Sequence, residues 1–254
     1  DEVICEYGAH IFNYECGAPA MLSGVQLHPL HGEHGIITPD QVEGAIRPSN
    51  VHHPSTKIVA LENTHNRAGG VVYPIEVMAA IAEVAWDNGL LMHLDGARLM
   101  NAVVATGLSA EEYASHFDSV SLCFSKGLGA PVGSIIAGSE EFIERAHRYR
   151  KVYGGGMRQA GIIAAGALYA IRNNVRRLAQ DHENAKLFAT GINQLGAIAV
   201  DLEWVQTNII MFEVDPKQMT AQELCARLEE RAIFMFPDSK QRIRAVKNLM
   251  VNRD

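Results

Sequence analysis

Short apolar runs alternate with amphipathic stretches along most of this chain. The runs expected to form strands cover residues 2–6, 24–30, 57–62, 90–94, 119–124 and 133–137. Helical patterns between and after them cover residues 17–22, 75–88, 109–115, 139–151, 157–172 and 175–195. Parallel strands need a long crossover, usually a helix, whereas antiparallel strands need only a turn. The order of elements therefore predicts an α/β fold with a mostly parallel sheet wrapped by helices.

The pattern changes after Gly196. A strand at 208–214, a helix at 220–231 and short strands at 232–236 and 242–246 are typical of a smaller α+β unit. We therefore expect a large domain over residues 1–173. A connecting helix and a small C-terminal α+β domain are expected over residues 174–254.

Composition and charge restrict the class of protein. With 48% hydrophobic and 20% charged residues among 254, the chain has the composition of a globular protein. The formal net charge of -7 argues against nucleic acid as a partner, because phosphate backbones require a basic face. No apolar run approaches the roughly 20 residues that span a bilayer, and the start DEVICEYG does not resemble a signal peptide. We expect no membrane partner.

The cysteines form no recognisable metal or disulfide pattern. The four stand far apart in the sequence, at Cys5, Cys16, Cys123 and Cys225. Without a C-x-x-C pair, neither a zinc site nor a disulfide framework is indicated, which fits a cytoplasmic protein.

Three histidines recur at every third position: His28, His31 and His34. A proline and two glycines interrupt any helix that would align them, so we expect a solvated loop and no metal site.

Two polar side chains stand where predicted parallel strands end, which is where open α/β sheets bind ligands. Asp95 closes the run LLMHL, and Lys126 follows the run SLCFS. A lysine that attaches a carbonyl cofactor must lose its proton, which partial burial or a cation such as Arg98 favours. An aspartate opposite a pyridine nitrogen keeps that nitrogen protonated. Together they indicate a pyridoxal phosphate site.

Each of these residues also has a structural interpretation. Asp95 could cap the helix that begins at DGAR, and Arg98 could form a surface ion pair. Lys126 could be an exposed lysine beside an ordinary turn. Taken alone, the residues leave both interpretations open.

Five longer segments carry a more specific signal. They are AHIFNYE (9–15), LENTHN (61–66), HLDGARLMNA (93–102), SLCFSKGLGAPVGS (121–134) and GGGMRQAG (154–161). These segments resemble the threonine aldolase family of fold-type I pyridoxal phosphate enzymes. The resemblance covers nearly the whole chain and implies a fold-type I large domain with a small C-terminal domain.

The resemblance implies a role for each matching residue. Lys126 would attach the cofactor, Asp95 would pair with its pyridine nitrogen, and His10 would stack on its ring. Arg98 and Arg244 match the arginines that bind the substrate carboxylate, a task that suits a planar guanidinium.

Two further residues receive roles in the same way. Arg158 matches a position that reaches the cofactor phosphate across a subunit interface, which implies a homo-oligomer, expected to be a tetramer built from dimers. His52 matches a histidine near the substrate hydroxyl. Either His52, His10 or a water that they hold would then act as the base.

The activity implied by the resemblance is the retro-aldol cleavage of L-threonine and L-allo-threonine to glycine and acetaldehyde, or of related β-hydroxy-α-amino acids to glycine and another aldehyde. Two alternatives stay open. A β-eliminating amino-acid lyase on the same fold would release a keto acid and ammonia. A catalytically silent fragment or assembly subunit would hold no cofactor.

The chain departs from the family at both ends. The family's N-terminal segment, with a phosphate-binding loop of small residues and a further substrate-carboxylate contact, does not precede Asp1. Near the other end, Lys247 and Asn248 stand where the family commonly has Thr-His, and the terminal helix is absent. We therefore expect a part of a longer enzyme, and activity from that enzyme rather than from residues 1–254 alone.

Overall fold

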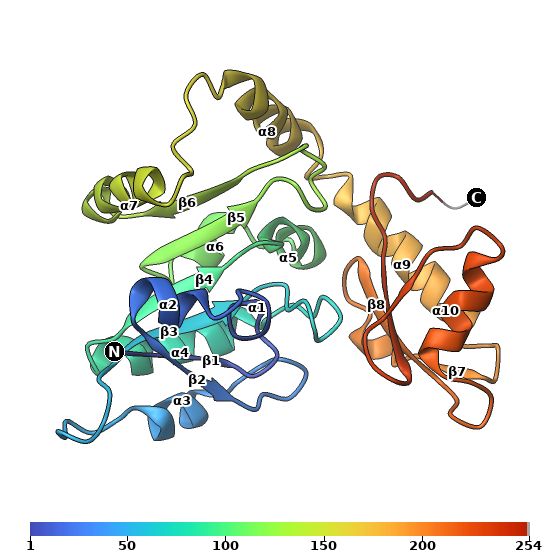
Figure 1. Ribbon diagram of the computed structural model, residues 1–254, viewed down its shortest axis with the longest axis horizontal. Helices are drawn as coiled ribbons and strands as arrows, with labels where there is room; N and C mark the ends of the chain where they lie inside the picture. The colour runs from blue at the N-terminus through green and yellow to red at the C-terminus, as the bar shows by residue number, and fades with distance from the viewer. Residues whose placement is uncertain (253–254) are drawn as a thin grey trace.

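The chain forms two lobes, each built on its own sheet, in the computed structural model, which describes residues 1–252 (Figure 1). The large lobe contains six strands in the order β2-β1-β3-β4-β5-β6. Their bounds are β1 Glu2–Glu6, β2 Gln26–Leu30, β3 Thr56–Glu62, β4 Leu91–Asp95, β5 Ser119–Cys123 and β6 Ser134–Gly138. The first five strands are parallel, which confirms the predicted sheet.

β6 runs antiparallel to β5 at the edge of the sheet. Only the loop of residues 124–133 joins these two strands, so there is no crossover helix that would return the chain in parallel. Register aligns Glu62 with Asp95, and Asp95 with Ser121. The carboxyl ends of β3, β4 and β5 therefore lie side by side at the same end of the strands, which we call the carboxyl edge of the sheet.

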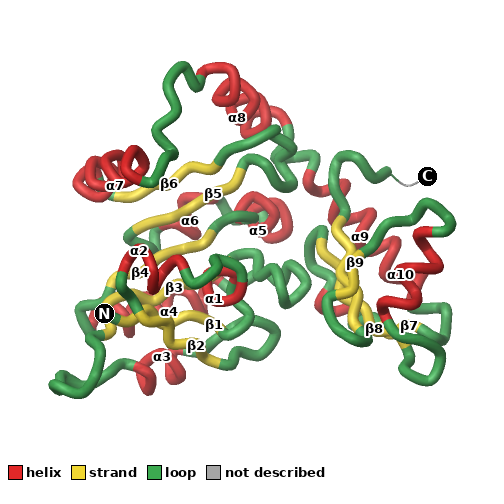
Figure 2. The backbone as a smooth tube through the Cα atoms, viewed as in Figure 1, coloured by secondary structure: helices red, strands yellow, loops and turns green. Residues whose placement is uncertain are grey.

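Helices cover the large sheet on both faces, as the tube in Figure 2 shows. Their bounds are α1 His10–Asn13, α2 Ala18–Ser23, α3 Pro39–Ala45, α4 Ile75–Asp87, α5 Leu99–Thr106, α6 Ala110–Ala114, α7 Glu140–Val152 and α8 Gly161–Asn173. Alternate strand residues point to opposite faces. Ile4 and Val59 accordingly pack in the core beneath α3, α4 and α5, whereas Val3 and Ala60 pack on the other side, with α1.

The small lobe follows a connecting helix. Its elements are α9 Leu178–Ile192, β7 Ile198–Ala199, a 3-10 turn at Leu202–Trp204, β8 Ile209–Val214, α10 Ala221–Glu229, β9 Phe236–Pro237 and β10 Arg242–Val246. Leu178 of α9 packs in a cluster with Leu128, and Ala185 packs in the small-lobe core with Ile243. α9 therefore contributes to both lobes. The predicted domain limit at 173/174 falls just before α9 and stays a prediction.

Several details differ from the sequence-based expectation, and α1 and β7 were not predicted. The predicted strand at 232–236 is wrong except for its last residue, because Ala232 adopts a left-handed φ of 60° that turns the chain after α10. α3 was not predicted, although Thr38 provides a full capping box with Gln41 and Pro39 stands at the first helical position. No helix within residues 1–252 combines the length and the apolar character that crossing a membrane requires.

Candidate active site

The carboxyl edge of the large sheet brings Asp95 and Lys126 to neighbouring strand ends. Asp95 Oδ1 accepts a hydrogen bond from the Ala97 backbone N–H at 3.0 Å, so this residue does brace the turn that follows β4. Its second oxygen accepts no hydrogen bond from residues 1–252. Lys126 is half-buried in the turn after β5, and its amine makes no side-chain hydrogen bond or ion pair with the described residues. Both groups are available to a ligand.

His10 begins α1 at the same edge. Its backbone N–H donates to Glu62 Oε2 at 2.7 Å, which holds the start of the helix at the end of β3. The imidazole Nε2 lies 3.1 Å from Glu15 Oε1, and the ring is partly exposed. The helix start therefore places His10 near the carboxyl end of β3.

Two arginines from different lobes approach each other. Arg98 precedes α5 in the large lobe, and Arg244 lies on β10 in the small lobe. Burial lowers the pKa of Arg98 below its ordinary value, and the positive charge of Arg244 lowers it further, against opposing contributions from Glu62, Cys123 and Asp95. Burial also lowers the pKa of Arg244.

Neither arginine forms an ion pair with a carboxylate of residues 1–252. Arg244 Nη2 instead donates to Asn66 Oδ1 at 2.8 Å, and its buried Nε has no partner in the described chain. Two partly desolvated positive charges without a carboxylate partner favour an anion between them. An amino-acid carboxylate has the right charge and geometry.

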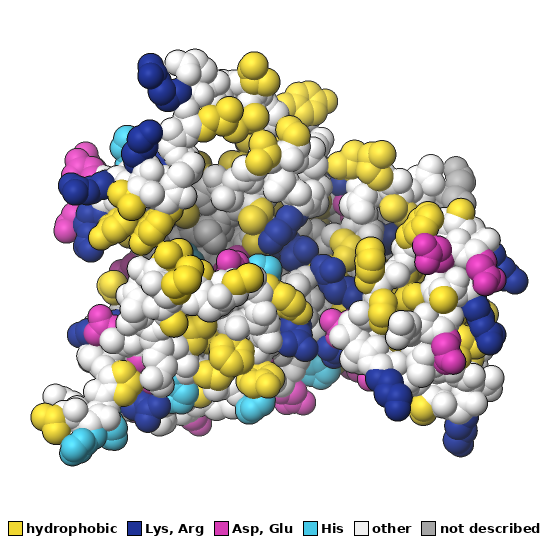
Figure 3. All heavy atoms as spheres, in the orientation of Figure 1, with side chains coloured by type: hydrophobic (Ala, Val, Ile, Leu, Met, Phe, Trp, Pro, Cys, Tyr) yellow, Lys and Arg dark blue, Asp and Glu magenta, His cyan; other side chains and the backbone are white. Residues whose placement is uncertain are grey.

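A cleft of about 950 Å³ lies between the lobes and is lined by Arg244 but, among the described residues, not by Arg98. Its lining includes His10, Tyr14 and Asn66 from the large lobe, and Arg244 and Phe236 from the small lobe. Asp95 lines a separate cavity of about 470 Å³ together with Glu62 and Ser121. Figure 3 shows basic side chains gathered along the junction of the two lobes. The cleft is therefore large enough, and positive enough, for a small anionic substrate.

The residues at this edge fit a pyridoxal phosphate cofactor. Three buried side-chain atoms there make no hydrogen bond within the described chain: Asn63 Nδ2, Thr64 Oγ1 and Arg244 Nε. Buried polar atoms are normally paired, so these atoms favour a polar ligand. An amine free of ion pairs suits attachment of an aldehyde, and the open oxygen of Asp95 suits a ring N–H.

Two predicted residues lie apart from this cluster. His52 is exposed in the loop before β3, at the amino edge of the sheet and hence opposite the strand ends that carry Asp95 and Lys126 (Figure 1). Its predicted role at the substrate hydroxyl stays a prediction. Arg158 is exposed in the turn between α7 and α8, where it makes no hydrogen bond or ion pair with the described residues.

Comparison with known proteins identifies the family. Residues 1–215 match the beta-eliminating lyase family. The low-specificity L-threonine aldolase 1 of Arabidopsis thaliana is 42% identical over 251 residues, which cover 96% of this chain and 70% of that protein. The low specificity L-threonine aldolase of Escherichia coli K12 is 38% identical over 255 residues, covering 100% and 74%. The chain belongs to the threonine aldolase family.

This finding confirms the resemblance seen in the motifs. The threonine aldolase of Leishmania major superposes with a TM-score of 0.82 at 19% identity, covering 99% of this chain and 73% of that one. At so low a sequence identity, this superposition shows that the two proteins share a fold. The predicted fold-type I architecture is thus confirmed.

Sequence reasoning missed two residues that contact the candidate site. Glu62 and Asn66 both belong to the LENTHN segment that carried the resemblance, but neither received a role. The signal was present, since a buried strand that ends in a glutamate is unusual. The sequence did not reveal that Glu62 contacts His10 or that Asn66 contacts Arg244, because these partners lie far away in the sequence.

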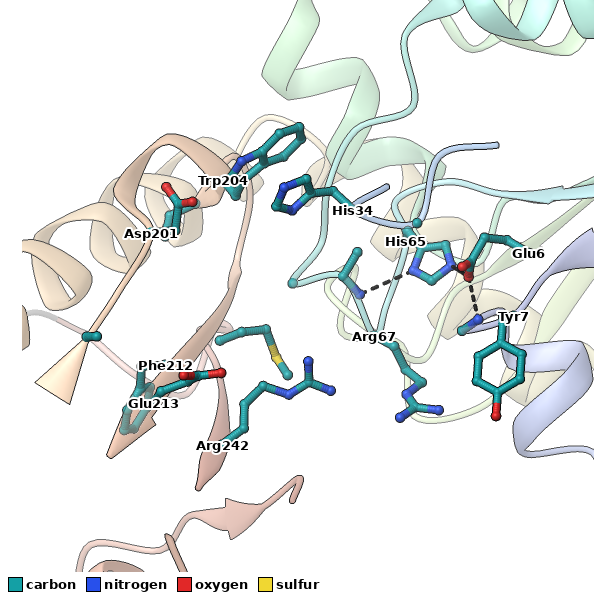
Figure 4. A pocket seen from close by; sticks show the side chains of 17 residues that line it. Glu6, Tyr7, His34, His65, Arg67, Asp201, Trp204, Phe212, Glu213 and Arg242 are labelled. Carbon is teal, nitrogen blue, oxygen red and sulfur yellow. Dashed lines mark hydrogen bonds and ion pairs between the residues drawn. The ribbon is translucent and has the colours of Figure 1, made fainter. Parts of the chain in front are cut away.

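A second cavity of about 510 Å³ contains none of the predicted site residues (Figure 4). In it, Glu6 accepts hydrogen bonds from His65 Nε2 at 3.0 Å and from the backbone of Gly8. Burial alone would raise the pKa of Glu6, but these hydrogen bonds bring it below its ordinary value. His34 stacks on Trp204 with ring centroids 3.7 Å apart. These contacts join the large-lobe loops to each other and to the small lobe.

Proposed function

We propose that this protein is a pyridoxal phosphate-dependent lyase that cleaves L-threonine, L-allo-threonine and similar β-hydroxy-α-amino acids to glycine and an aldehyde. The observation that carries the proposal is the pair of arginines without carboxylate ion pairs in the described chain, Arg98 and Arg244, of which Arg98 lies near the strand-end residue Asp95. Curated relatives named low-specificity L-threonine aldolases support the choice of reaction.

Substrate binding begins with the carboxylate. Arg98 and Arg244 come from different lobes, so one carboxylate bound by both would also hold the lobes in a fixed relation. Each planar guanidinium can donate two parallel hydrogen bonds to a carboxylate, which fixes orientation as well as position. A carboxylate held in this way would also fix the directions of the other bonds at Cα.

The strand-end residues would hold the cofactor. Lys126 would attach it through its amine, the open oxygen of Asp95 would pair with the ring N–H, and His10 would lie against the ring. Bound pyridoxal phosphate supplies an electron sink for the electron pair that is released when the Cα–Cβ bond breaks. A carboxylate at Asp95 favours the protonated ring nitrogen and hence that sink.

Cleavage requires one proton to leave the β-hydroxyl and one proton to reach Cα. His10 lines the cleft together with Arg244 and is the candidate base that a single chain provides. Glu15 lies beside its Nε2, which favours the tautomer that carries a proton on Nε2 and leaves Nδ1 free to accept one. His52 of another copy, or a water held by either histidine, is the other candidate.

Product analysis tests the proposed reaction. The purified protein, incubated with pyridoxal phosphate and L-threonine, should release glycine and acetaldehyde in equal amounts. A keto acid with ammonia would instead identify a β-eliminating lyase. A protein that stays colourless after incubation with pyridoxal phosphate would identify a silent subunit.

The proposal includes a homo-oligomer, a tetramer built from dimers, in the cytoplasm. Support comes from the exposed Arg158 and from the position of His52 at the opposite edge of the sheet, since both roles require another copy of the chain. Sedimentation velocity should give the mass of four chains, and Arg158→Ala should weaken cofactor binding. A monomer that retains full cofactor affinity would exclude these roles.

A further inference from the structure

Glu62 stands at the centre of the candidate site although it was assigned no role. Its side chain is buried at the end of β3, next to the register partner Asp95. One oxygen accepts the backbone N–H of His10 at 2.7 Å, and the other accepts the backbone N–H of Asn66 at 2.9 Å. One carboxylate therefore holds two separate segments of the site.

Asn66 extends this connection to the small lobe. Its side-chain oxygen accepts the hydrogen bond from Arg244 Nη2 at 2.8 Å, across 178 positions of sequence. The connection thus runs from His10 through Glu62 and Asn66 to Arg244. It joins the group expected on the cofactor ring to a group expected on the substrate carboxylate.

The distribution of charge along this connection explains why the arginine remains available. Glu62 carries the negative charge, and both of its oxygens accept backbone N–H groups rather than a guanidinium. Asn66, which does contact Arg244, is neutral. A neutral amide orients a guanidinium without neutralising it, whereas a carboxylate there would compete with an incoming anion.

We propose that Glu62 and Asn66 are positioning residues that set the substrate-binding orientation of Arg244 relative to His10, and that Asn66 must be uncharged for Arg244 to bind a carboxylate. The inference rests on the proposed function for the identity of that carboxylate. Neither residue needs to touch the reacting atoms.

Substitutions at Asn66 separate orientation from charge. Asn66→Ala removes the acceptor, and Asn66→Asp keeps an acceptor but adds a negative charge beside Arg244. A hydrogen bond to a charged group supports a loss on the order of tenfold in glycine affinity for Asn66→Ala. Asn66→Asp should weaken glycine binding more than Asn66→Ala does, because the new carboxylate occupies the guanidinium.

Glu62→Gln tests the other half of the connection. Its amide has one acceptor oxygen and one NH₂ group, so one of the two backbone N–H groups must lose its partner. Glycine affinity should fall by roughly tenfold. Glu2→Gln is the matched control, because Glu2 is also a buried carboxylate of the large sheet but stands on β1 at the opposite end of the strands, with Arg47 and Thr56.

Glycine binding to the cofactor-loaded protein is followed by the change in visible absorbance, which needs no turnover. The unloaded protein gives a second measurement, the hydrogen exchange of the backbone amides of residues 10 and 66. In Glu62→Gln at least one of these amides should exchange faster than in the wild type and in Glu2→Gln.

Two results would overturn the inference. One is a Glu62→Gln protein whose glycine affinity and amide exchange match those of Glu2→Gln, even if both lose thermal stability. The other is an Asn66→Asp protein that binds glycine as well as Asn66→Ala does. Failure to form glycine and acetaldehyde from L-threonine would count against the proposed function alone, because neither measurement depends on cleavage.

Discussion

Protonation of His182 should destabilise this protein at mildly acidic pH. The imidazole is buried on α9, where its Nε2 lies 3.0 Å from Asn101 Nδ2. The same amide nitrogen donates to Asn208 Oδ1 at 3.2 Å, and Asn208 Nδ2 donates to the carbonyl of Lys247 at 2.8 Å. An Nε2 that accepts a hydrogen bond carries no proton, so this network requires the neutral imidazole.

The magnitude follows from the pKa. Burial lowers the pKa of His182 from 6.5 to about 4; the charge of Asp181 opposes this to a smaller extent, and the charge of Lys186 adds to it. Because the folded pKa lies below the unfolded one, the unfolded chain binds the proton first, and stability falls as pH drops from about 6.5 towards 4. Between pH 7.5 and pH 5.0 the loss due to this one group is about 2 kcal/mol in the free energy of unfolding.

The assay compares urea unfolding of the wild type and His182→Gln at both pH values. Glutamine offers an oxygen to Asn101 but cannot take up a proton in this range. All other histidines are present in both proteins, so their effects cancel in the difference. The wild type should lose about 2 kcal/mol more than His182→Gln between pH 7.5 and pH 5.0. Equal losses in the two proteins would refute the argument.

Three other substitutions test the site and the junction of the lobes, and a fourth serves as a control. Lys126→Ala should abolish cofactor attachment trapped by borohydride, and a reduced adduct on another lysine would contradict the assignment. Arg244→Lys should raise the half-saturating threonine concentration by roughly tenfold or more, because an ammonium cannot replace the planar guanidinium. An unchanged concentration would exclude a contact between Arg244 and the substrate carboxylate. Gly70→Ala should destabilise strongly, because its φ is +73° and a Cβ would lie 2.4 Å from Thr207 Oγ1. Gly107→Ala is the control, because Gly107 has φ +80° and open space around it. Its free energy of unfolding should fall by only roughly 1–2 kcal/mol, the cost of a left-handed residue. Equal losses in Gly70→Ala and Gly107→Ala would exclude the clash.

Local pattern was sufficient for most of the large lobe. β1, β3, β4 and α4 lie within a residue or two of their predicted ranges, because apolar periodicity and flanking Gly or Pro act over a few residues. Local pattern did not predict the antiparallel direction of β6 or the two-residue length of β9. Their direction and length depend on partner strands rather than on their own residues.

The candidate site, too, could be predicted only in part from local sequence. Asp95 and Lys126 could be placed at strand ends from the sequence, and the family motifs drew attention to His10, Arg98 and Arg244. Their proximity, however, depends on strand register and on how the small lobe packs against the large one. The resemblance gave His52 a role as well, although no motif contains it, and the fold leaves His52 near the amino end of β3.

Short segments of the sequence encode the fold class, the family and the chemical types at the strand ends, so these could be predicted before the fold was known. The long-range packing brings the charge of Arg244 close enough to lower the pKa of Arg98, and it lets Glu62 and Asn66 connect His10 to Arg244. These relations join residues as many as 178 positions apart. They arise from long-range packing, which periodicity and motif spacing do not contain.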